Sequence, residues 1–417
     1  MHRINWFKPI RVNMNSIELF AGAGGLGLGV SLAGFHPVLV VERDSYCCDT
    51  IRENQLRKIA PVSSWPLSQG DVRAVDFKQY ENKVQLVTGG PPCQPFSIGG
   101  KHRAYDDARD MFPQAVRALR EAKPEAFIFE NVKGLTRQSF RNYLEYIRLQ
   151  MIHPEVAIRS GEGWDDHLAR LEQYETAGST SGLHYNVVVH LANAADFGIP
   201  QRRERVFFVG FRSDLGIGWN FPRQTHSAEA LAWSQYRDGS YWDQHNVKVR
   251  DRALSERGRA KGWSLDGAPT LKPWRTVRDA IHDLPDPERD RDASALILNH
   301  RFQQGARSYK GHTGSPLDAP AKTLKAGVHG VPGGENMLLK PNGNVRYFSV
   351  RESARLQTFP DNFLFHGSWT EAMRQLGNAV PVDLARIVAG DVMRHLEMRR
   401  GDGTLQPTRQ DQSRKKH

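Results

Sequence analysis

Cysteine is scarce in this chain, since its 417 residues include only Cys47, Cys48 and Cys93. Two adjacent cysteines and one distant one make neither a disulfide framework nor a tetrahedral metal site, so a disulfide-stapled exported domain is excluded and no metal is expected. Long apolar runs are also missing, because no window offers the roughly 18 apolar residues that a membrane span needs. The leader at residues 1–13 is basic but has no apolar stretch behind it. We therefore expect a protein of the cytoplasm that does not enter the membrane.

Acidic residues are in the minority. Lysine and arginine number 57 against 46 aspartates and glutamates, which gives a net charge of +11. This balance favours a polyanionic partner, because basic side chains that neutralise phosphates release condensed counterions. Charge alone does not decide the matter, since a basic surface that is merely solvated has the same composition.

The first half of the chain alternates short apolar runs with helix-length stretches, which predicts an α/β fold with a parallel sheet. Four runs are predicted to be strands, at residues 16–20, 37–41, 84–88 and 126–130. Within them, Leu39–Val41 and Phe127–Phe129 are apolar at successive positions. Central strands that are covered on both faces have this pattern.

The composition and periodicity of the chain change after Arg212, where a loop-rich stretch with scattered aromatics runs to about Val345. Helical periodicity returns in Val350–Gln357 and Val382–Met398. A chain of this length exceeds the usual size of one core, so we expect two domains. The predicted division is a first domain at 14–215 and 346–398, a smaller second domain at 216–345, and a disordered basic tail at 399–417.

A glycine-rich turn follows the first predicted strand, in Phe20-Ala21-Gly22-Ala23-Gly24-Gly25-Leu26-Gly27. Such glycines let the backbone turn sharply and approach a ligand at the N-terminus of the next helix. Glu42, at the end of the second strand, is placed to accept hydrogen bonds from a ribose diol, and Asp71 suits an adenine amino group. The pattern fits either a nicotinamide dinucleotide or S-adenosylmethionine. Phe20 could stack on the adenine or fill the core.

A second motif surrounds one cysteine, in Gly89-Gly90-Pro91-Pro92-Cys93-Gln94-Pro95-Phe96-Ser97. The prolines fix φ and remove amide donors, so the loop is stiff and holds the thiol in a set direction at the carboxyl edge of the sheet. The fourth strand ends at the same edge in Glu130, so cysteine and acid could face one cavity. A buried thiol and a helix-capping acid are the alternative interpretation. Cys47 and Cys48 fall in the helix predicted after the second strand and are expected to be buried.

Six blocks, in this order along the chain, resemble the motif set of DNA (cytosine-5)-methyltransferases of the bacterial restriction-modification or phage-defence type. They are Phe20–Gly25, Gly90–Gln94, Glu130–Val132, Gln201–Phe207, Arg351–Leu356 and Gln375–Val380. A chance match to the whole series is negligible. The resemblance implies a Rossmann-like catalytic domain, a smaller target-recognition domain, and S-adenosylmethionine as methyl donor with S-adenosylhomocysteine as product.

The resemblance also assigns roles to single residues. Cys93 would be the nucleophile and Glu130 would protonate or hydrogen-bond ring nitrogen 3 of cytosine. Arg203 and Arg205, spaced to lie on one face of a strand, would hold the target nucleotide and its phosphate. The implied cofactor residues are Phe20, Ala21, Gly22, Gly24, Gly25, Leu26, Glu42, Arg43, Asp71, Val72, Gly90, Pro91, Asn378, Ala379 and Val380.

Double-stranded DNA is the implied partner, and its target base must leave the helix to reach a thiolate. Residues 245–278 contain nine basic residues against three acidic ones, with tryptophans among them, which suits phosphate and base contacts but also a solvated face over a core. The expected DNA contacts are Gln94, Ser97, Gln201, Arg203, Arg205, Arg250, Arg252 and Lys325.

Three other functions compete with this interpretation. A nicotinamide-dependent oxidoreductase would leave the Pro-Pro-Cys loop and the basic second domain unexplained. A non-catalytic nucleic-acid-binding protein is disfavoured because Cys93 and Glu130 are both present. A tRNA-directed member of the same family is disfavoured because the region after Arg212 is long. We expect a monomer associated with the bacterial nucleoid, alongside a cognate restriction or defence system.

Overall fold

A seven-stranded sheet forms the centre of the larger domain in the computed structural model, which describes residues 14–92, 110–178, 182–252, 267–310, 312–326 and 336–402. The strand order is β3-β2-β1-β4-β5-β7-β6. The strands are β1 Met14–Leu19, β2 Phe35–Glu42, β3 Leu67–Gln69, β4 Leu86–Gly89, β5 Ala126–Val132, β6 Tyr185–Asn193 and β7 Glu204–Arg212. The first five in that order are parallel, and β7 is antiparallel to both of its neighbours. The predicted α/β class is confirmed, and the sheet is mixed because β7 reverses direction.

Helices cover both faces of this sheet. On one face lie α1 (Gly25–Leu32) and α13 (Val382–Asp402), which share a core with Ile128 of β5. On the other face lie α3 (Phe112–Ala122) and α4 (Arg141–Ile152), which share a core with Phe127 and Phe129. Alternate residues of β5 thus enter different cores, as the continuous apolar run predicted for a strand covered on both faces.

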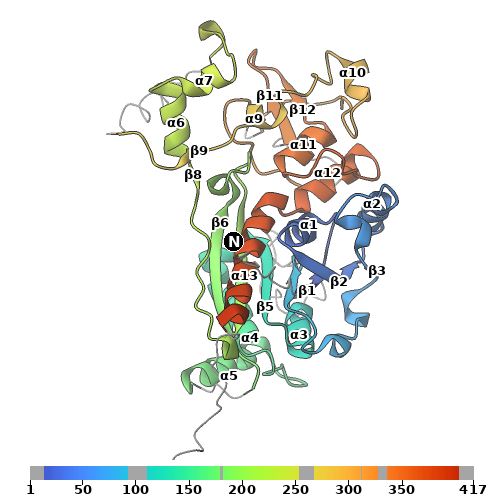
Figure 1. The fold of residues 1–417 in the computed structure, drawn as a ribbon, viewed down its shortest axis with the longest axis vertical. Helices are drawn as coiled ribbons and strands as arrows, with labels where there is room; N and C mark the ends of the chain where they lie inside the picture. Colours follow the sequence, from blue (N-terminus) through green and yellow to red (C-terminus); the bar gives the residue numbers. More distant parts are fainter. Residues whose placement is uncertain are drawn as a thin grey trace, which may run out of the picture.

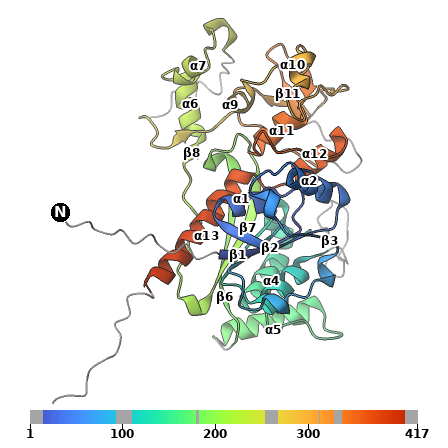
Figure 2. The same ribbon diagram turned by 45° about the vertical axis from the view of Figure 1, so that its right-hand side comes forward.

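Two further helices flank the larger domain. The helix α2 (Ser45–Leu56) follows β2 and buries both Cys47 and Cys48, as predicted. The helix α5 (Trp164–Thr176) packs on α4 at the end of the molecule that is farthest from the smaller lobe (Figure 2). Within the described ranges, no helix is long and apolar enough to span a bilayer.

The smaller lobe stands above the sheet in Figure 1 and consists of short elements. They are β8 His226–Ser227, α6 Ala228–Tyr236, α7 Ser240–Gln244, β9 Lys272–Pro273, α9 Val277–Ile281, α10 Arg291–Ala295, β10 Ser315–Pro316, β11 Met337–Leu339 and β12 Val345–Tyr347. The helices α11 (Val350–Leu356) and α12 (Trp369–Asn378) lie between these strands and α1. Because Leu356 packs with the smaller lobe and Ala354 with the glycine loop, α11 belongs to both cores.

The division differs in detail from the boundaries predicted at 216 and 399. Ile217 and Trp219 pack in the same core as α13, so the chain leaves the larger domain several residues after 216. The helix α13 runs on to Asp402 because its last basic side chains find acceptors. Arg399 donates to the carbonyl of Leu215 at 3.0 Å, and the Arg400 guanidinium pairs with Glu125 at 2.7 Å. The rest of the predicted tail lies outside the described residues.

Candidate functional site

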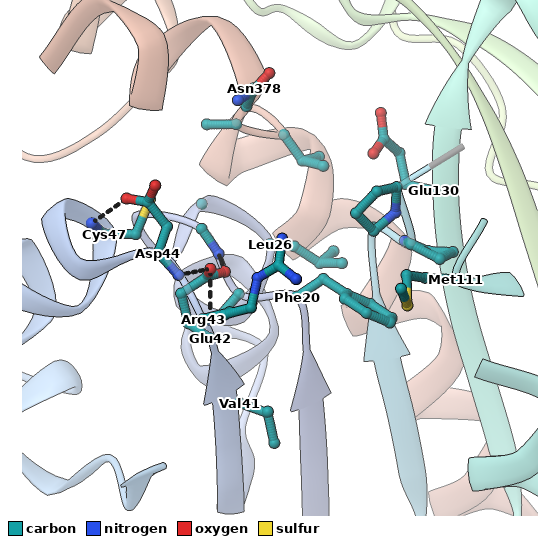
Figure 3. Close-up of a pocket in the computed structure, with 18 of the residues that line it drawn as sticks. Phe20, Leu26, Val41, Glu42, Arg43, Asp44, Cys47, Met111, Glu130 and Asn378 are labelled. Atoms are coloured by element: carbon teal, nitrogen blue, oxygen red, sulfur yellow. Dashed lines mark hydrogen bonds between the residues drawn. The ribbon is translucent and has the colours of Figure 1, made fainter. Parts of the chain in front are cut away.

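A cavity of about 710 Å³ opens at the carboxyl ends of β1, β2, β4 and β5 (Figure 3). It lies where the strand order reverses between β1 and β4, which is the place where ligands bind in open α/β sheets. Its size is within the range of roughly 300–1,000 Å³ found for small-molecule sites. Of the predicted cofactor residues, all except Gly24 line this cavity.

The glycine loop forms the floor of the cavity. Gly22 and Gly24 have φ values of +56° and +92°, which an L side chain would adopt only with strain. Phe20 has φ +55° although it is not glycine, and its ring points across the cavity toward Met111 (Figure 3). A Cβ atom on Gly25 would stand 2.4 Å from the carbonyl oxygen of Val380. The loop therefore needs glycine both for its turns and for its contact with the C-terminal helices.

Glu42 is held by three backbone amides. Its Oε2 accepts from Gly22 at 2.7 Å, and its Oε1 accepts from Arg43 and Asp44 at 2.7 Å each (Figure 3). A carboxylate offers about four acceptor sites, two on each oxygen, so the Arg43 and Asp44 amides fill Oε1 and Oε2 keeps a site for a ligand hydroxyl. The amides fix the orientation of this carboxylate before any ligand arrives.

Asp71 lies at the edge of the cavity beyond β3 and already has cationic neighbours. Its Oδ2 is 3.7 Å from the Arg43 guanidinium and 3.3 Å from that of Arg73, while its Oδ1 accepts from the Arg73 amide. Val72 is buried next to it and offers an apolar surface. This end of the cavity therefore combines a carboxylate, two guanidiniums and an apolar wall, a set that suits a purine ring.

The last residue of α12 and the two residues after it close the cavity from above. Asn378, Ala379 and Val380 line it, and Figure 3 shows the Asn378 side chain above Leu26. A neighbouring pair that sequence analysis did not identify joins α2 to α12: the Arg374 guanidinium donates to Asp44 at 3.0 Å, and Asp44 also caps α2 through the Cys47 amide. The helix-capping signature of Asp44 was readable from sequence, whereas its partner lies 330 residues away.

Glu130 and Arg205 form the other wall of the cavity. The Arg205 Nε lies 2.7 Å from the Glu130 Oε1, and both side chains are largely buried. Burial raises the pKa of Glu130, and the positive charges of Arg205 and Arg203 lower it by less. A carboxyl group in this setting can hold or share a proton with a ligand nitrogen at near-neutral pH.

The cysteine motif enters the same wall from β4. The Asn131 side chain donates to the carbonyl of Pro91 at 2.9 Å, and the Met111 amide donates to the carbonyl of Pro92 at 3.1 Å. Gly90 faces the Glu130 carboxylate, because a Cβ atom added to Gly90 would stand 3.3 Å from the Glu130 Oε2. Cys93, Gln94 and Ser97 lie outside the described residues, but Pro92, which precedes Cys93, lines the cavity with Glu130.

Arg203 and Gln201 are fully buried and do not reach the surface expected for DNA contacts. Arg203 precedes β7, which begins at Glu204, so it does not share a strand face with Arg205. Its guanidinium donates to the carbonyls of Leu324 and Gly377. The Gln201 amide donates to the carbonyl of Leu356 at 3.2 Å and its Oε1 accepts from the Leu324 amide. The two side chains thus pair with backbone groups of Leu324 and of the last turns of α11 and α12.

The remaining predicted DNA contacts lie in the smaller lobe. Arg250 is exposed and stands 3.8 Å from Asp251, and Arg252 donates to Asp243 at 3.3 Å. The backbone of Lys325 is held by Asn336. Sequence analysis also missed Glu18, which lies beneath the glycine loop, is buried in β1 and accepts from the Thr88 hydroxyl. A single acid in an apolar strand was the signal that could have revealed it.

Comparison with known proteins agrees with this geometry. The family model for C-5 cytosine-specific DNA methylases matches residues 14–153 and 171–394. The chain is 31% identical over 403 residues to the Type II methyltransferase M.PspPI of Psychrobacter sp. (strain TA137), covering 95% of this chain and 84% of that protein. It is 32% identical over 380 residues to the Type II methyltransferase M.FnuDI of Fusobacterium nucleatum, with coverages of 90% and 93%.

Solved structures show the same fold at lower identity. The DNMT2 of Spodoptera frugiperda superposes with a TM-score of 0.54 at 16% identity, covering 92% of this chain and all of that one. The Dnmt2 methyltransferase of S. pombe gives a TM-score of 0.52 at 16% identity, with coverages of 93% and 99%. The strand order, the cavity at the carboxyl edge and the family match lead to one conclusion: this chain belongs to the C-5 cytosine-specific DNA methylases.

Proposed function

We propose that this enzyme transfers a methyl group from S-adenosylmethionine to carbon 5 of a flipped-out cytosine in a specific duplex DNA sequence, through a covalent adduct with Cys93. The observation that carries the proposal is one cavity whose walls combine Glu42 and the glycine loop on one side with Glu130, Arg205 and Pro92 on the other. Methyl donor and target base can therefore meet within a single enclosed space.

The residues of the first wall suit the donor. Glu42 presents free acceptor capacity toward the ribose hydroxyls, and Asp71 with Val72 suits the adenine. The N-terminus of α1 and the segment Asn378–Val380 would enclose the amino-acid end. When bound, the cofactor supplies an electrophilic sulfonium methyl group and leaves as S-adenosylhomocysteine.

The residues of the second wall suit the base. Carbon 5 of cytosine is a weak nucleophile, so the Cys93 thiolate adds to carbon 6 and pushes electron density toward carbon 5. Glu130 shares a proton with ring nitrogen 3, which relieves the charge that develops on the ring. Arg205 orients the Glu130 carboxyl through their ion pair. After methyl transfer, carbon 5 gives its proton to a water molecule and the Cys93 thiolate is expelled from carbon 6, which restores the aromatic ring.

DNA would lie between the cavity mouth and the smaller lobe. Arg250, Arg252 and Lys325 are candidate backbone or base contacts on that lobe, and Gln94 and Ser97 are candidates next to the cysteine. A base inside a duplex cannot present carbon 6 to a thiol, so the target nucleotide must rotate out of the helix. Since the relatives named above are Type II methyltransferases, we further propose a cytoplasmic, nucleoid-associated monomer that protects host DNA in a restriction-modification or phage-defence system.

Bisulfite sequencing of DNA from a host that expresses the protein would first identify the target sequence. The test then uses duplex DNA that carries 5-fluorocytosine at the target position of that sequence. Fluorine cannot leave as a cation, so the adduct should persist through denaturing electrophoresis and should require S-adenosylmethionine. Cys93→Ala should abolish the adduct but still bind the cofactor. Cys47→Ala, which removes a buried thiol of α2, should still form the adduct. An adduct that forms equally well without Cys93 would overturn the assignment of the nucleophile.

A further inference from the structure

Arg374 of α12 pairs with two carboxylates at the cavity wall. Its Nη2 donates to the Asp44 Oδ1 at 3.1 Å and Oδ2 at 3.0 Å. Its Nε and Nη2 also donate to the Oε2 of Glu371, in the first turn of α12, at 2.9 and 2.6 Å. Arg374 and Asp44 both line the cavity. One guanidinium therefore fixes α12 to the residue that begins α2.

Asp44 in turn holds its neighbours through both its side chain and its backbone (Figure 3). Its Oδ1 accepts from the Cys47 amide at 3.0 Å and so caps α2, while its own amide donates to the Glu42 Oε1 at 2.7 Å. Glu42 is the carboxylate whose Oε2 keeps an acceptor site for a ligand hydroxyl. Arg374 is thus connected to the ligand-binding carboxylate through a single residue.

The contact between Arg374 and Asp44 is a charge-assisted pair. Burial raises the pKa of Asp44, but hydrogen bonds from Arg374 and from the Cys47 amide lower it by more, so the pKa lies below its ordinary value. The carboxylate is therefore ionised at neutral pH, and hydrogen bonds between ionised groups are the stronger ones. Within the described ranges of the chain, Arg374 is the only cation that pairs with Asp44. Loss of the guanidinium would leave this carboxylate without its main restraint.

The packing of α2 against α12 does not depend on Arg374 alone. The Thr50 hydroxyl donates to the Gln375 Oε1 at 2.6 Å, and both side chains are buried. Asn54 of α2 donates to the carbonyl of Leu364, which precedes α12, at 2.8 Å. These contacts remain when Arg374 is replaced. A variant should therefore keep its fold and change only the cavity wall.

We propose that Arg374 is a positioning residue for recognition of the cofactor ribose: it fixes Asp44, and Asp44 fixes the Glu42 carboxylate that accepts from a ribose hydroxyl. The inference rests on the proposed function, because it takes S-adenosylmethionine as the ligand of the cavity. A carboxylate that is oriented in advance loses less freedom when the ligand binds, so Arg374 increases affinity without touching the ligand. Its contribution should therefore disappear for a ligand that has no ribose hydroxyls.

Calorimetry would measure the dissociation constants of S-adenosylhomocysteine and of its 2′,3′-dideoxy analogue. The wild type should bind S-adenosylhomocysteine more tightly by roughly tenfold or more, as expected for a hydrogen bond to a charged group. Arg374→Met should reduce this ratio to about threefold or less, because it weakens only the ligand that has the hydroxyls.

Steady-state methylation gives a second readout. Arg374→Met should raise the KM for S-adenosylmethionine by roughly the factor that the ratio loses and leave kcat within about twofold, as for loss of an interaction that is equal in the ground and transition states. A merely structural defect would weaken both ligands equally and lower kcat.

A second variant tests the route through Asp44. Asp44→Asn keeps the cap of α2, since asparagine is a favoured N-cap residue, but offers Arg374 only a neutral acceptor. It should lower the ratio in the same way, and the double variant with Arg374→Met should lower it no further. Arg52→Met is the matched control, because Arg52 donates to Asp49 at 3.0 Å and to Gln69 at 2.6 Å and so joins α2 to β3 outside the cavity. This control should keep the wild-type ratio and KM.

Three results would overturn the role of Arg374. They are a folded Arg374→Met protein with an unchanged ratio, an Asp44→Asn protein that keeps the ratio, and a wild type that binds both ligands equally well. Failure of the proposed function would look different, because the wild type would then bind neither S-adenosylhomocysteine nor its analogue.

Discussion

The Nε of Arg205 lies 2.7 Å from the Oε1 of Glu130, and the pair connects β7 to β5 across the antiparallel part of the sheet. Burial raises the pKa of Glu130. The positive charges of Arg205 and Arg203 oppose that shift, and Arg205 has the larger effect. The protonation of this cavity carboxyl group is thus set by a balance between desolvation and the positive charges of Arg205 and Arg203.

Arg205→Gln should move the pH dependence of methyl transfer. Without the guanidinium, the pKa of Glu130 rises further, so the limb of the pH–rate profile that reports this carboxyl should shift to higher pH. The rate should also fall by roughly tenfold or more, because the carboxyl loses its orienting partner. Single-turnover methylation measured between about pH 5 and 9 would show both effects.

Arg202 is the matched control for that experiment, since it is the adjacent arginine and its side chain is exposed. Arg202→Gln should leave the position of the limb unchanged. A profile that stays in place in Arg205→Gln would mean that the titrating group is not Glu130.

Glu42→Gln should weaken S-adenosylmethionine binding. An amide has only one acceptor oxygen in place of two, so it cannot satisfy the amides of Gly22, Arg43 and Asp44 and the ribose hydroxyls together. Loss of a charged hydrogen bond costs about 2 kcal/mol, which corresponds to roughly a 30-fold higher Kd. Calorimetry would measure it. Asp76→Asn is the control, because Asp76 is an exposed carboxylate outside the cavity that accepts from the Lys78 amide. This variant should leave the Kd unaltered.

Gly29→Ala and Gly390→Ala should change stability in opposite directions. A Cβ on Gly29 of α1 would stand 2.5 Å from the Ala385 Cβ and 2.5 Å from the Val382 oxygen of α13, so the helices must separate, at a cost of about 1–3 kcal/mol. A Cβ on Gly390 would meet nothing within 4 Å, so alanine there should raise the free energy of unfolding by up to about 1 kcal/mol. Urea unfolding distinguishes them. If both variants lost stability equally, the close contact of α1 with α13 would not be the cause.

Glu18→Gln should flatten the pH dependence of stability. Burial raises the pKa of Glu18 from 4.5 to about 8. Its contribution is therefore fully present below pH 4.5, where folded and unfolded chains both hold the proton, and is lost as pH rises toward about 8, because only the unfolded chain releases it. The loss is on the order of a few kcal/mol over this window. Urea unfolding across the window should show a shallower decline in the variant, whereas Glu172→Gln, an exposed carboxyl on α5, should keep the wild-type slope.

Exchange of residues 222–340 for the matching region of a relative with another specificity should change which cytosines are methylated. The segment begins after Ile217 and Trp219, which pack with α13, so the larger core remains intact. The cavity residues of the larger domain are all retained. Bisulfite sequencing would report the new site. A folded, active chimera that still marks the original sequence would place specificity outside the exchanged lobe.

The sequence by itself determined which residues meet at the carboxyl edge of the sheet. Phe20, Glu42, Pro91 and Glu130 each follow or end an apolar run, and parallel strands bring such ends to one edge whatever the intervening loops do. Burial on both faces follows from the local pattern of apolar residues, so it could be read without coordinates. The same pattern could not show that β7 is antiparallel, because hydrophobic periodicity carries no direction.

Only the tertiary structure decided the roles of two arginines that lie two residues apart. Their spacing predicted one strand face, yet β7 begins between them, so Arg205 turns to Glu130 while Arg203 turns away. The partners of Arg203 are carbonyls 121 and 174 residues along the chain. Contacts of such separation depend on how whole elements pack, and no local propensity or spacing specifies them.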